Sequence, residues 1–230
     1  MDRRILVAIG SMAAVGGLAA FVLGGRRGET DRPAPEPTRT ETPPPQPAAP
    51  APAAATTDPM LAERALGRAD APVTVIEYFS LTCIHCATFH RETLPRVKAE
   101  LIDTGKIRLV QNDFPLDQPG LLAAMVARAL PPDRHAAFID MLFRTQAQWV
   151  REGFVEELAR LAALAGMSRE TFDATLRNEA LQRGVLEIRL RGERDHQVNA
   201  TPTFIFNNRV PGVSGAIPFD RFAREAGVTT

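Results

Sequence analysis

The pattern of apolar and polar positions divides the chain into three parts. Residues 5–23 are uncharged and mostly apolar, and residues 29–59 carry almost no large apolar side chain. From Met60 onward, apolar positions recur at the spacings of strands and helices. The pattern therefore predicts an N-terminal apolar segment within residues 1–28, a linker over 29–59 and one folded domain over 60–230.

The first segment is long enough to cross a membrane. Its 19 residues would span about 28 Å as a helix, close to the thickness of a bilayer core. Arg3-Arg4 and Arg26-Arg27 flank both ends, so the charges alone do not set its orientation. Its end, Ala-Phe-Val-Leu-Gly-Gly, lacks the small-x-small pattern of a signal-peptide cleavage site. We favour an uncleaved membrane anchor, with a cleaved signal peptide as the alternative.

The linker over 29–59 is rich in Pro, Ala, Thr and Glu. Such a segment cannot bury enough apolar surface to fold, so we expect it to be disordered. Its prolines favour extended polyproline II, at about 3.1 Å per residue. A semi-rigid spacer after a membrane helix would hold the folded domain away from the bilayer.

The folded domain begins with a β-α-β pattern. Residues 73–79 form a nearly continuous apolar run, typical of a strand covered on both faces, and Glu77 interrupts it. Residues 86–104 show helical spacing, with a kink expected at Pro95. Residues 106–114 alternate as a second strand. The order predicts a parallel pair of strands joined by a right-handed crossover.

Helical periodicity then runs over about 118–197, which predicts an inserted helical subdomain. The predicted helices cover residues 121–130, 133–144, 154–165, 168–176 with Ser168 as the N-cap, and 179–196. Strand character returns at 201–206. Asn207-Asn208 indicates a hairpin turn to a partner strand over 209–213, and 218–226 form a last helix. The fold class is therefore α/β, with strands and helices on both sides of a helical insert.

Both cysteines of the chain lie where the first strand leads into the first helix. Cys83 and Cys86 enclose Ile84 and His85, giving a Cys-x-x-Cys motif, which is a redox signature in this position. A helix start offers unpaired N–H groups and the positive end of the helix dipole. These would stabilise a thiolate at Cys83, the form that attacks disulfides. A structural disulfide or a metal pair is the alternative, although a loop this short gains little from a structural bridge.

Composition narrows the function further. Lys+Arg and Asp+Glu both number 27, so nothing suggests a nucleic-acid partner. Two cysteines allow at most one intramolecular disulfide, so the chain is no disulfide-stapled scaffold. The apolar content of 45% is ordinary for a globular core.

The motifs and the order of elements resemble the thioredoxin-like DsbA family of thiol–disulfide oxidoreductases. The resemblance rests on Glu-Tyr-Phe-Ser-Leu-Thr-Cys-Ile-His-Cys at 77–86 and Thr-Pro-Thr-Phe at 201–204. It covers about residues 60–230, and the helical insert lies where the family carries its own. It implies a thioredoxin-like fold in which Cys83 attacks and Cys86 is the resolving thiol.

The resemblance also assigns roles around the two cysteines. His85 matches the histidine of the family's Cys-Pro-His-Cys and would favour the Cys83 thiolate; the alternative is an exposed bystander. Thr201-Pro202 looks like the family's cis-proline loop, whose exposed Thr201 backbone would pair with an extended substrate. The alternative there is a trans proline opening a strand. Glu77 occupies the position of the family's buried acid, where it would relay a proton for Cys86; the alternative is a Glu at a strand edge facing water.

Other candidate residues have weaker motifs. His90 follows Cys86 by four residues and could complete a copper or zinc site with the cysteines, but a solvated helix residue is the favoured interpretation. We interpret His135 and His196 as surface residues. Trp149 is expected in the core or rim of the insert, or lining a groove that faces the active site. The Arg-rich run 183–194 alternates with acids and predicts a solvated helix face.

These observations predict a membrane-tethered dithiol oxidase of the bacterial periplasm, where disulfides persist. It would pass the Cys83–Cys86 disulfide to reduced exported proteins and be reoxidised by a DsbB-like, quinone-linked membrane partner. No cofactor and no resident metal are predicted. Ile84 in place of the family's Pro, and Thr201 where many oxidants carry Val, leave a disulfide reductase or isomerase as an alternative. A periplasmic copper- or zinc-binding chaperone that uses Cys83, Cys86 and a histidine is another.

Overall fold

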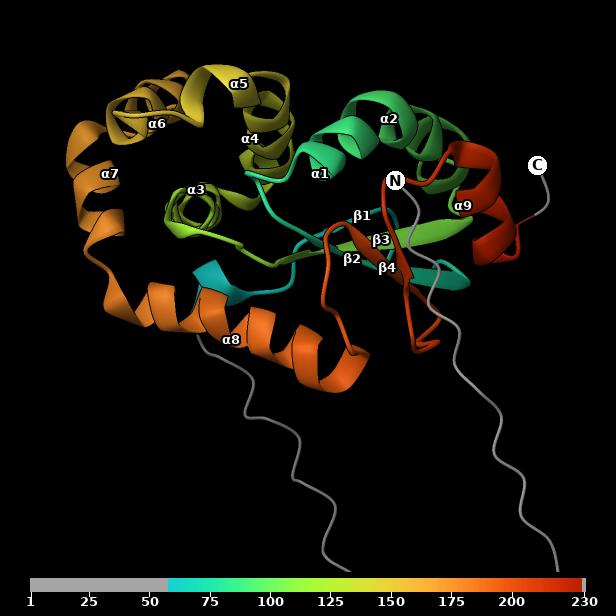
Figure 1. Cartoon of the computed structure of the whole chain (residues 1–230). Helices are drawn as coiled ribbons and strands as arrows, with labels where there is room; N and C mark the ends of the chain where they lie inside the picture. The colour runs from blue at the N-terminus through green and yellow to red at the C-terminus, as the bar shows by residue number, and fades with distance from the viewer. Residues whose placement is uncertain (1–57, 229–230) are drawn as a thin grey trace, which may run out of the picture. The chain divides into compact units, whose positions relative to one another are not determined.

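A five-stranded sheet lies at the centre of the described part of the chain, residues 58–228 of a computed structural model (Figure 1). The strand order is β1 (Ala65–Leu66), β3 (Ile107–Asp113), β2 (Val73–Phe79), β4 (Thr203–Phe206) and β5 (Val213–Ser214). The β2–β3 pair is parallel and the other pairs are antiparallel. The predicted β-α-β unit is therefore confirmed.

Strand β2 occupies the middle of the sheet because its apolar residues are covered on both faces. Val75 pairs with Leu109 of β3 on one side and with Phe206 of β4 on the other. The strand has the predicted bounds, and β3 is one residue shorter at each end than predicted. The two-residue strand β1 was not predicted, since so short a pairing leaves no periodicity in the sequence.

The helical segment that contains Cys86 changes its hydrogen-bonding pattern three times. α1 (Ile84–Thr88) leads into a π-helical turn at Phe89–Thr93, then α2 (Leu94–Val97) and a second π-helical turn at Lys98–Ile102. Pro95 lies in α2 and has no N–H to donate to the preceding turn. The regular helix is interrupted beside Pro95, where the sequence predicts a kink.

The insert predicted over about 118–197 is helical, as expected. It contains α3 (Gln118–Ala129), α4 (Pro132–Arg144), α5 (Gln146–Trp149), α6 (Phe154–Leu164), α7 (Arg169–Leu176) and α8 (Glu179–His196). The four-residue α5 is the one that the sequence did not indicate. Trp149 is fully buried and its indole donates to the carbonyl of Leu142 at 2.9 Å, so it belongs to the core of the insert. Phe79, Leu81 and Cys86 pack in the same apolar cluster, which joins the insert to the cysteine motif.

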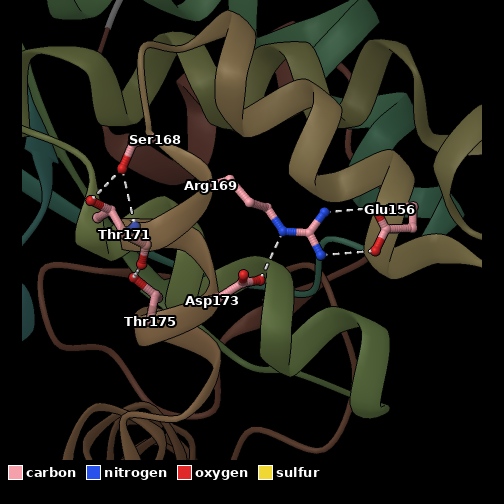
Figure 2. Close-up of polar contacts among 6 residues, drawn as sticks. All are labelled: Glu156, Ser168, Arg169, Thr171, Asp173 and Thr175. Atoms are coloured by element: carbon pink, nitrogen blue, oxygen red, sulfur yellow. Dashed lines mark hydrogen bonds and ion pairs between the residues drawn. The ribbon is translucent and has the colours of Figure 1, made fainter.

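Helix α7 begins with the predicted Ser168 cap (Figure 2). The Ser168 hydroxyl accepts from the Thr171 N–H at 3.1 Å, satisfying a donor that a helix start leaves free. Arg169 binds Glu156 of α6 and Asp173 of its own helix. These are exposed ion pairs, which contribute little to stability, so packing and not charge holds α6 and α7 together.

The chain returns to the sheet through β4. Asn207 and Asn208 have positive φ angles of 48° and 59°, as expected for the predicted turn. The partner strand is only Val213–Ser214, not 209–213, and a cis Val210–Pro211 bond lies in the loop before it. Helix α9 (Phe219–Ala226) closes the fold and contributes to a second core, built around the rings of Phe89, Phe204, Phe206 and Phe222.

The membrane anchor predicted over 5–23 and all but the end of the linker lie outside the described residues. Asp58 and Pro59, the last two linker residues, start the folded part: the Asp58 carboxylate caps a 3₁₀ turn at Pro59–Leu61. Within residues 58–228, no helix has the length and apolar character that crossing a membrane requires.

Candidate active site

Cys83 lies immediately before the first residue of the helix that carries Cys86. It is the N-cap of α1, with extended backbone, and its N–H donates to the Ser80 carbonyl at 3.1 Å. Cys83 is partly exposed, whereas Cys86 lies one turn further along and is fully buried. Both thiols are free in this structure. The motif therefore presents one accessible sulfur and holds the other inside.

The loop before β4 brings Thr201 to Cys83. The Thr201–Pro202 peptide bond is cis, as the resemblance implies. The Cys83 Sγ lies 3.3 Å from the Thr201 carbonyl oxygen, across 118 residues of sequence. The Thr201 hydroxyl is buried and has no hydrogen-bond partner among the described residues, so it is free to donate to a Cys83 thiolate.

The surroundings of Cys83 favour its thiolate. A hydrogen bond from the Cys86 thiol is the largest of the effects that lower the pKa of Cys83 from 9.0 to about 5, against an opposing effect of burial. The Thr201 hydroxyl and the backbone N–H groups of Cys86 and His85 lower it further. The two N–H groups belong to the first turn of α1, where no helical carbonyl can accept them. At neutral pH Cys83 is therefore ready to act as a nucleophile or a leaving group.

The surroundings of Cys86 do the opposite. Burial raises the pKa of Cys86 far above its ordinary value, and the hydrogen bond to Cys83 and the negative charges of Cys83 and Glu77 add to the effect. Cys86 therefore stays protonated unless a nearby base accepts its proton. The two thiols of one motif thus have opposite tendencies.

Glu77 is fully buried in β2, as the resemblance implies, and its partner is His90. The His90 Nε2 lies 2.9 Å from Glu77 Oε1, and both side chains are at most 1% exposed. The interpretation of His90 as a solvated residue was wrong. Its place on the buried face follows from helical spacing, since it lies next to Phe89 and one turn after Cys86.

The metal interpretation also finds no support around the cysteines. In residues 58–228, no group of three or more His, Cys, Asp or Glu side chains is arranged to hold a metal ion. His90 is already paired with Glu77. Two thiols alone are fewer ligands than structural zinc sites in proteins ordinarily use.

His85 is exposed, and the structure assigns its contribution to the backbone. The His85 N–H is among the donors that stabilise the Cys83 thiolate. For its imidazole ring, which the resemblance gives a role, the described residues offer no hydrogen-bond partner. The role of the ring stays a prediction.

One residue of the site was missed entirely by the sequence analysis. Gln146 of α5 donates from its side-chain amide to the carbonyls of Leu81 and Cys83, at 2.9 and 3.1 Å. It ties the helical insert to the loop that carries the motif. A single Gln in a four-residue helix gives no signal in the sequence.

Apolar side chains are exposed next to the reactive sulfur. Ile84, directly after Cys83, is 67% exposed, and Leu116 is 50% exposed. The Leu116 N–H lies 3.4 Å from the Ser80 hydroxyl, which places this loop beside the motif. An exposed apolar surface at a reactive centre is suited to contact with unfolded protein chains.

Two further histidines differ from their predicted surface positions. His135 is buried, because it shares a face of α4 with Phe138 and Ile139, and burial lowers its pKa to about 4. His196 is half-buried, and its Nδ1 lies 2.7 Å from the Tyr78 hydroxyl. The Arg-rich run 183–194 is on α8 and pairs with acids of the same helix, as predicted.

Comparison with known proteins agrees with this geometry. The family model described as thioredoxin matches residues 60–223. A Rickettsia bellii protein named "Putative protein-disulfide oxidoreductase" is 29% identical over 147 residues, covering 63% of this chain and 57% of that protein. The Bacillus subtilis "Disulfide bond formation protein D" is 28% identical over 159 residues, covering 63% of this chain and 68% of that protein. The chain thus spans little more than half the length of the rickettsial relative.

Solved structures of two other proteins have a similar fold. The crystal structure of Wolbachia pipientis alpha-DsbA1 has a TM-score of 0.66 and 27% identity, covering 72% of this chain and 89% of that one. Oxidised BdbD from Bacillus subtilis has a TM-score of 0.64 and 23% identity, covering 72% of this chain and 91% of that one. The second likeness supports the fold alone.

Proposed function

The chain belongs to the thioredoxin family, and from that premise we propose that it is a DsbA-like thiol–disulfide oxidoreductase that introduces disulfides into exported proteins. The observation that carries the proposal is the contrast between the two thiols. The pKa of Cys83 is lowered to about 5, and the pKa of Cys86 is raised. A stabilised Cys83 thiolate favours the reduced enzyme, which makes the disulfide form a good oxidant.

The exchange follows from which sulfur is accessible. In the oxidised enzyme a substrate thiolate attacks Cys83 Sγ, the Cys83–Cys86 bond breaks, and the Cys86 sulfur takes up a proton. A second substrate thiolate then attacks the substrate sulfur of the mixed disulfide, and Cys83 leaves as a thiolate. The substrate loses two electrons and gains a disulfide, and the enzyme is left as a dithiol.

Three groups around the sulfurs have proposed roles. The Thr201 carbonyl, 3.3 Å from Cys83, would accept a hydrogen bond from the backbone of an extended substrate. The exposed side chains of Ile84 and Leu116 would contact apolar residues of that substrate. Glu77 would exchange a proton with Cys86, since its carboxylate is buried and its negative charge raises the pKa of that thiol.

The location and the partner are part of the same proposal. The apolar segment 5–23 supports an anchor in the bacterial inner membrane, with the catalytic domain in the periplasm. A cleaved, soluble periplasmic form is the alternative. Reoxidation by a DsbB-like or other quinone-linked membrane protein would return the enzyme to its disulfide form. The linker over 29–59 would give the domain the reach to meet both substrate and partner.

A disulfide reductase or isomerase is the second candidate. The Thr201 hydroxyl favours it, because isomerases of this superfamily often carry Thr before the cis proline. Both candidates use the same two sulfurs and differ in the direction of electron flow. The potential of the couple distinguishes them.

The experiment that tests the function is disulfide formation in a reduced, unfolded test protein, followed with the oxidised full chain. We expect stoichiometric oxidation by the wild type. Cys86→Ser, first converted by oxidised glutathione to its Cys83–glutathione disulfide, should accumulate mixed disulfides between Cys83 and the test protein, because the resolving thiol is gone. Cys83→Ser treated in the same way should accumulate none. Mixed disulfides that form through Cys86 instead would overturn the assigned roles.

A further inference from the structure

The buried position of Cys86 raises the question of where its proton goes. When the reduced enzyme is reoxidised, the Cys86 thiol must lose its proton in order to attack the mixed disulfide at Cys83. The partner in that mixed disulfide occupies the side of Cys83 that faces solvent. Cys86 itself is fully buried, so its proton needs a route through the protein.

The Glu77 carboxylate supplies the first step of such a route. One oxygen, Oε1, is occupied by His90 at 2.9 Å. The other, Oε2, is buried and has no hydrogen-bond partner among the described residues. A buried oxygen without a donor costs free energy, so its presence calls for an explanation. Accepting the proton of Cys86 would explain it.

The His90 ring connects this carboxylate to a pocket. Aromatic rings surround the imidazole, with the Phe143 ring centroid of α4 at 4.2 Å and the Phe79 centroid of β2 at 5.8 Å. Although its side chain is only 1% exposed, His90 also lines a pocket of about 440 Å³. Leu94 and Pro95 of α2 and Ala136 of α4 are among the other residues that line it.

Four charged side chains also line this pocket. They are Lys98, Asp133, Asp140 and Arg144, and Asp140 and Arg144 form an exposed ion pair at 2.7 Å. Of the other charged groups near His90, Glu77 binds its ring, and Arg91 donates to the carbonyl of Phe143. The carboxylates of Asp133 and Asp140 can accept hydrogen bonds from water in the pocket.

We propose that Glu77 and His90 form a proton route from the Cys86 thiol to water in the pocket between α2 and α4. His90 is thus a positioning residue that acts on Cys86 through Glu77, and imidazole suits the task because one ring nitrogen can accept a proton while the other donates one. The inference deepens the proposed function and rests on it. It assigns a second face of the protein to the proton, away from the sulfur that meets the substrate.

Oxidised glutathione can serve as the oxidant of the reduced enzyme. The Cys83 thiolate attacks one glutathione sulfur, and the first glutathione leaves as a thiolate. Cys86 then transfers its proton to Glu77 while its sulfur attacks Cys83 Sγ, and the second glutathione leaves. His90 passes a proton to pocket water as it accepts the one held by Glu77. Two electrons move from the enzyme to glutathione.

The test measures this second step in the full chain by stopped flow, starting from the reduced protein and oxidised glutathione. His90→Ala should slow the Cys86 step by about 10²-fold, the lower end of the effect of a positioned acid–base group. The attack by Cys83 should keep its rate. Imidazole in the buffer should restore the Cys86 step, because it can enter the pocket and occupy the place of the missing ring.

A second substitution shows whether the pocket is the route. Ala136→Leu, added to His90→Ala, should abolish the rescue by narrowing the pocket. Ala180→Leu, at an exposed position of α8, is the matched control and should leave the rescue intact. Phosphate of equal ionic strength should not rescue.

Two results would overturn the route. One is a wild-type Cys86 step in His90→Ala or in His90→Gln, which can keep a hydrogen bond to Glu77 but cannot carry a proton; the second variant serves if the first does not fold. The other is rescue that survives Ala136→Leu. The glutathione reaction does not depend on protein substrates, so failure of the proposed function would be seen separately as a lack of disulfide formation in the test protein.

Discussion

Two buried acid–base pairs lie on neighbouring strands of the sheet, and they serve different ends. Glu77 of β2 pairs with His90. Asp113, at the end of β3, pairs with Arg128 of α3, and both side chains are at most 3% exposed. Burial and pairing are therefore common to both and do not by themselves mark the functional one.

The partners make the difference. Arg128 is always charged, and beyond Asp113 it donates to the carbonyls of Met60 and Ala62, which fastens the start of the folded part to α3. The partner of Glu77 is His90, whose two ring nitrogens can accept or donate a proton, and the pair lies near the Cys86 thiol, which must lose its own. A fixed charge pair holds structure, whereas a titratable pair next to a reactive sulfur can move protons.

His135 shows that a buried histidine alone is not enough. It lies near Asp113 and Arg128, its Nε2 has no hydrogen-bond partner in the described residues, and burial lowers its pKa to about 4. The positive charges of Arg128 and Arg64 also lower it. It is therefore neutral at neutral pH, far from any group that needs a proton.

The largest expected effect comes from breaking the structural pair. Arg128→Met should lower the free energy of unfolding by about 3–5 kcal/mol, because it leaves the Asp113 carboxylate buried without a partner. Denaturant unfolding measures it. Arg160→Met, which breaks an exposed pair with Glu157, is the control and should leave the free energy of unfolding nearly unchanged. A change in the pKa of Cys83 in folded Arg128→Met would mean that the two regions are not separate.

A smaller effect should appear when the thiol site is changed without changing the fold. Thr201→Val removes the hydroxyl that can donate to the Cys83 thiolate and keeps the carbonyl. A hydrogen bond to a charged group is worth about 1.5–3 kcal/mol, so the pKa of Cys83 should rise from about 5 by at least about one pH unit. Thiolate absorbance of the reduced protein measures it. An unchanged titration would exclude the hydroxyl as a donor.

The same shift sets the pH dependence of the reduced protein. The pKa of Cys83 is 9.0 as an ordinary thiol and about 5 in the fold. Because the folded value is the lower one, the thiolate's contribution to stability is fully present above about pH 9 and decreases as the pH falls. It is absent below about pH 5. Thr201→Val should move that lower limit upward.

Much of the fold could be predicted from periodicity. Strand β2 and helix α8 have the predicted bounds, because a long apolar run and an eighteen-residue amphipathic pattern are strong signals. Strand β1 and helix α5 are too short to leave a pattern. Strand β5 is shorter than predicted because Pro211, inside the predicted strand, has no N–H to donate to the ladder.

The site, too, contains residues that the sequence predicts and residues that it does not. Cys83, Cys86 and Thr201-Pro202 come together as the motifs implied. His90 was misread, although Phe89 and His90 follow Cys86 by three and four residues, the spacing of one buried helix face. Gln146 could not have been found, because its role depends on a contact across 63 residues of sequence.

Stabilisation of the Cys83 thiolate is what makes the Cys83–Cys86 disulfide an oxidant. The equilibrium potential of this couple in the full chain, determined against glutathione, tests that link. We expect a value nearer to about −120 mV, as in DsbA, than to about −270 mV, as in thioredoxin. A potential close to that of thioredoxin would contradict the account and favour a reductase.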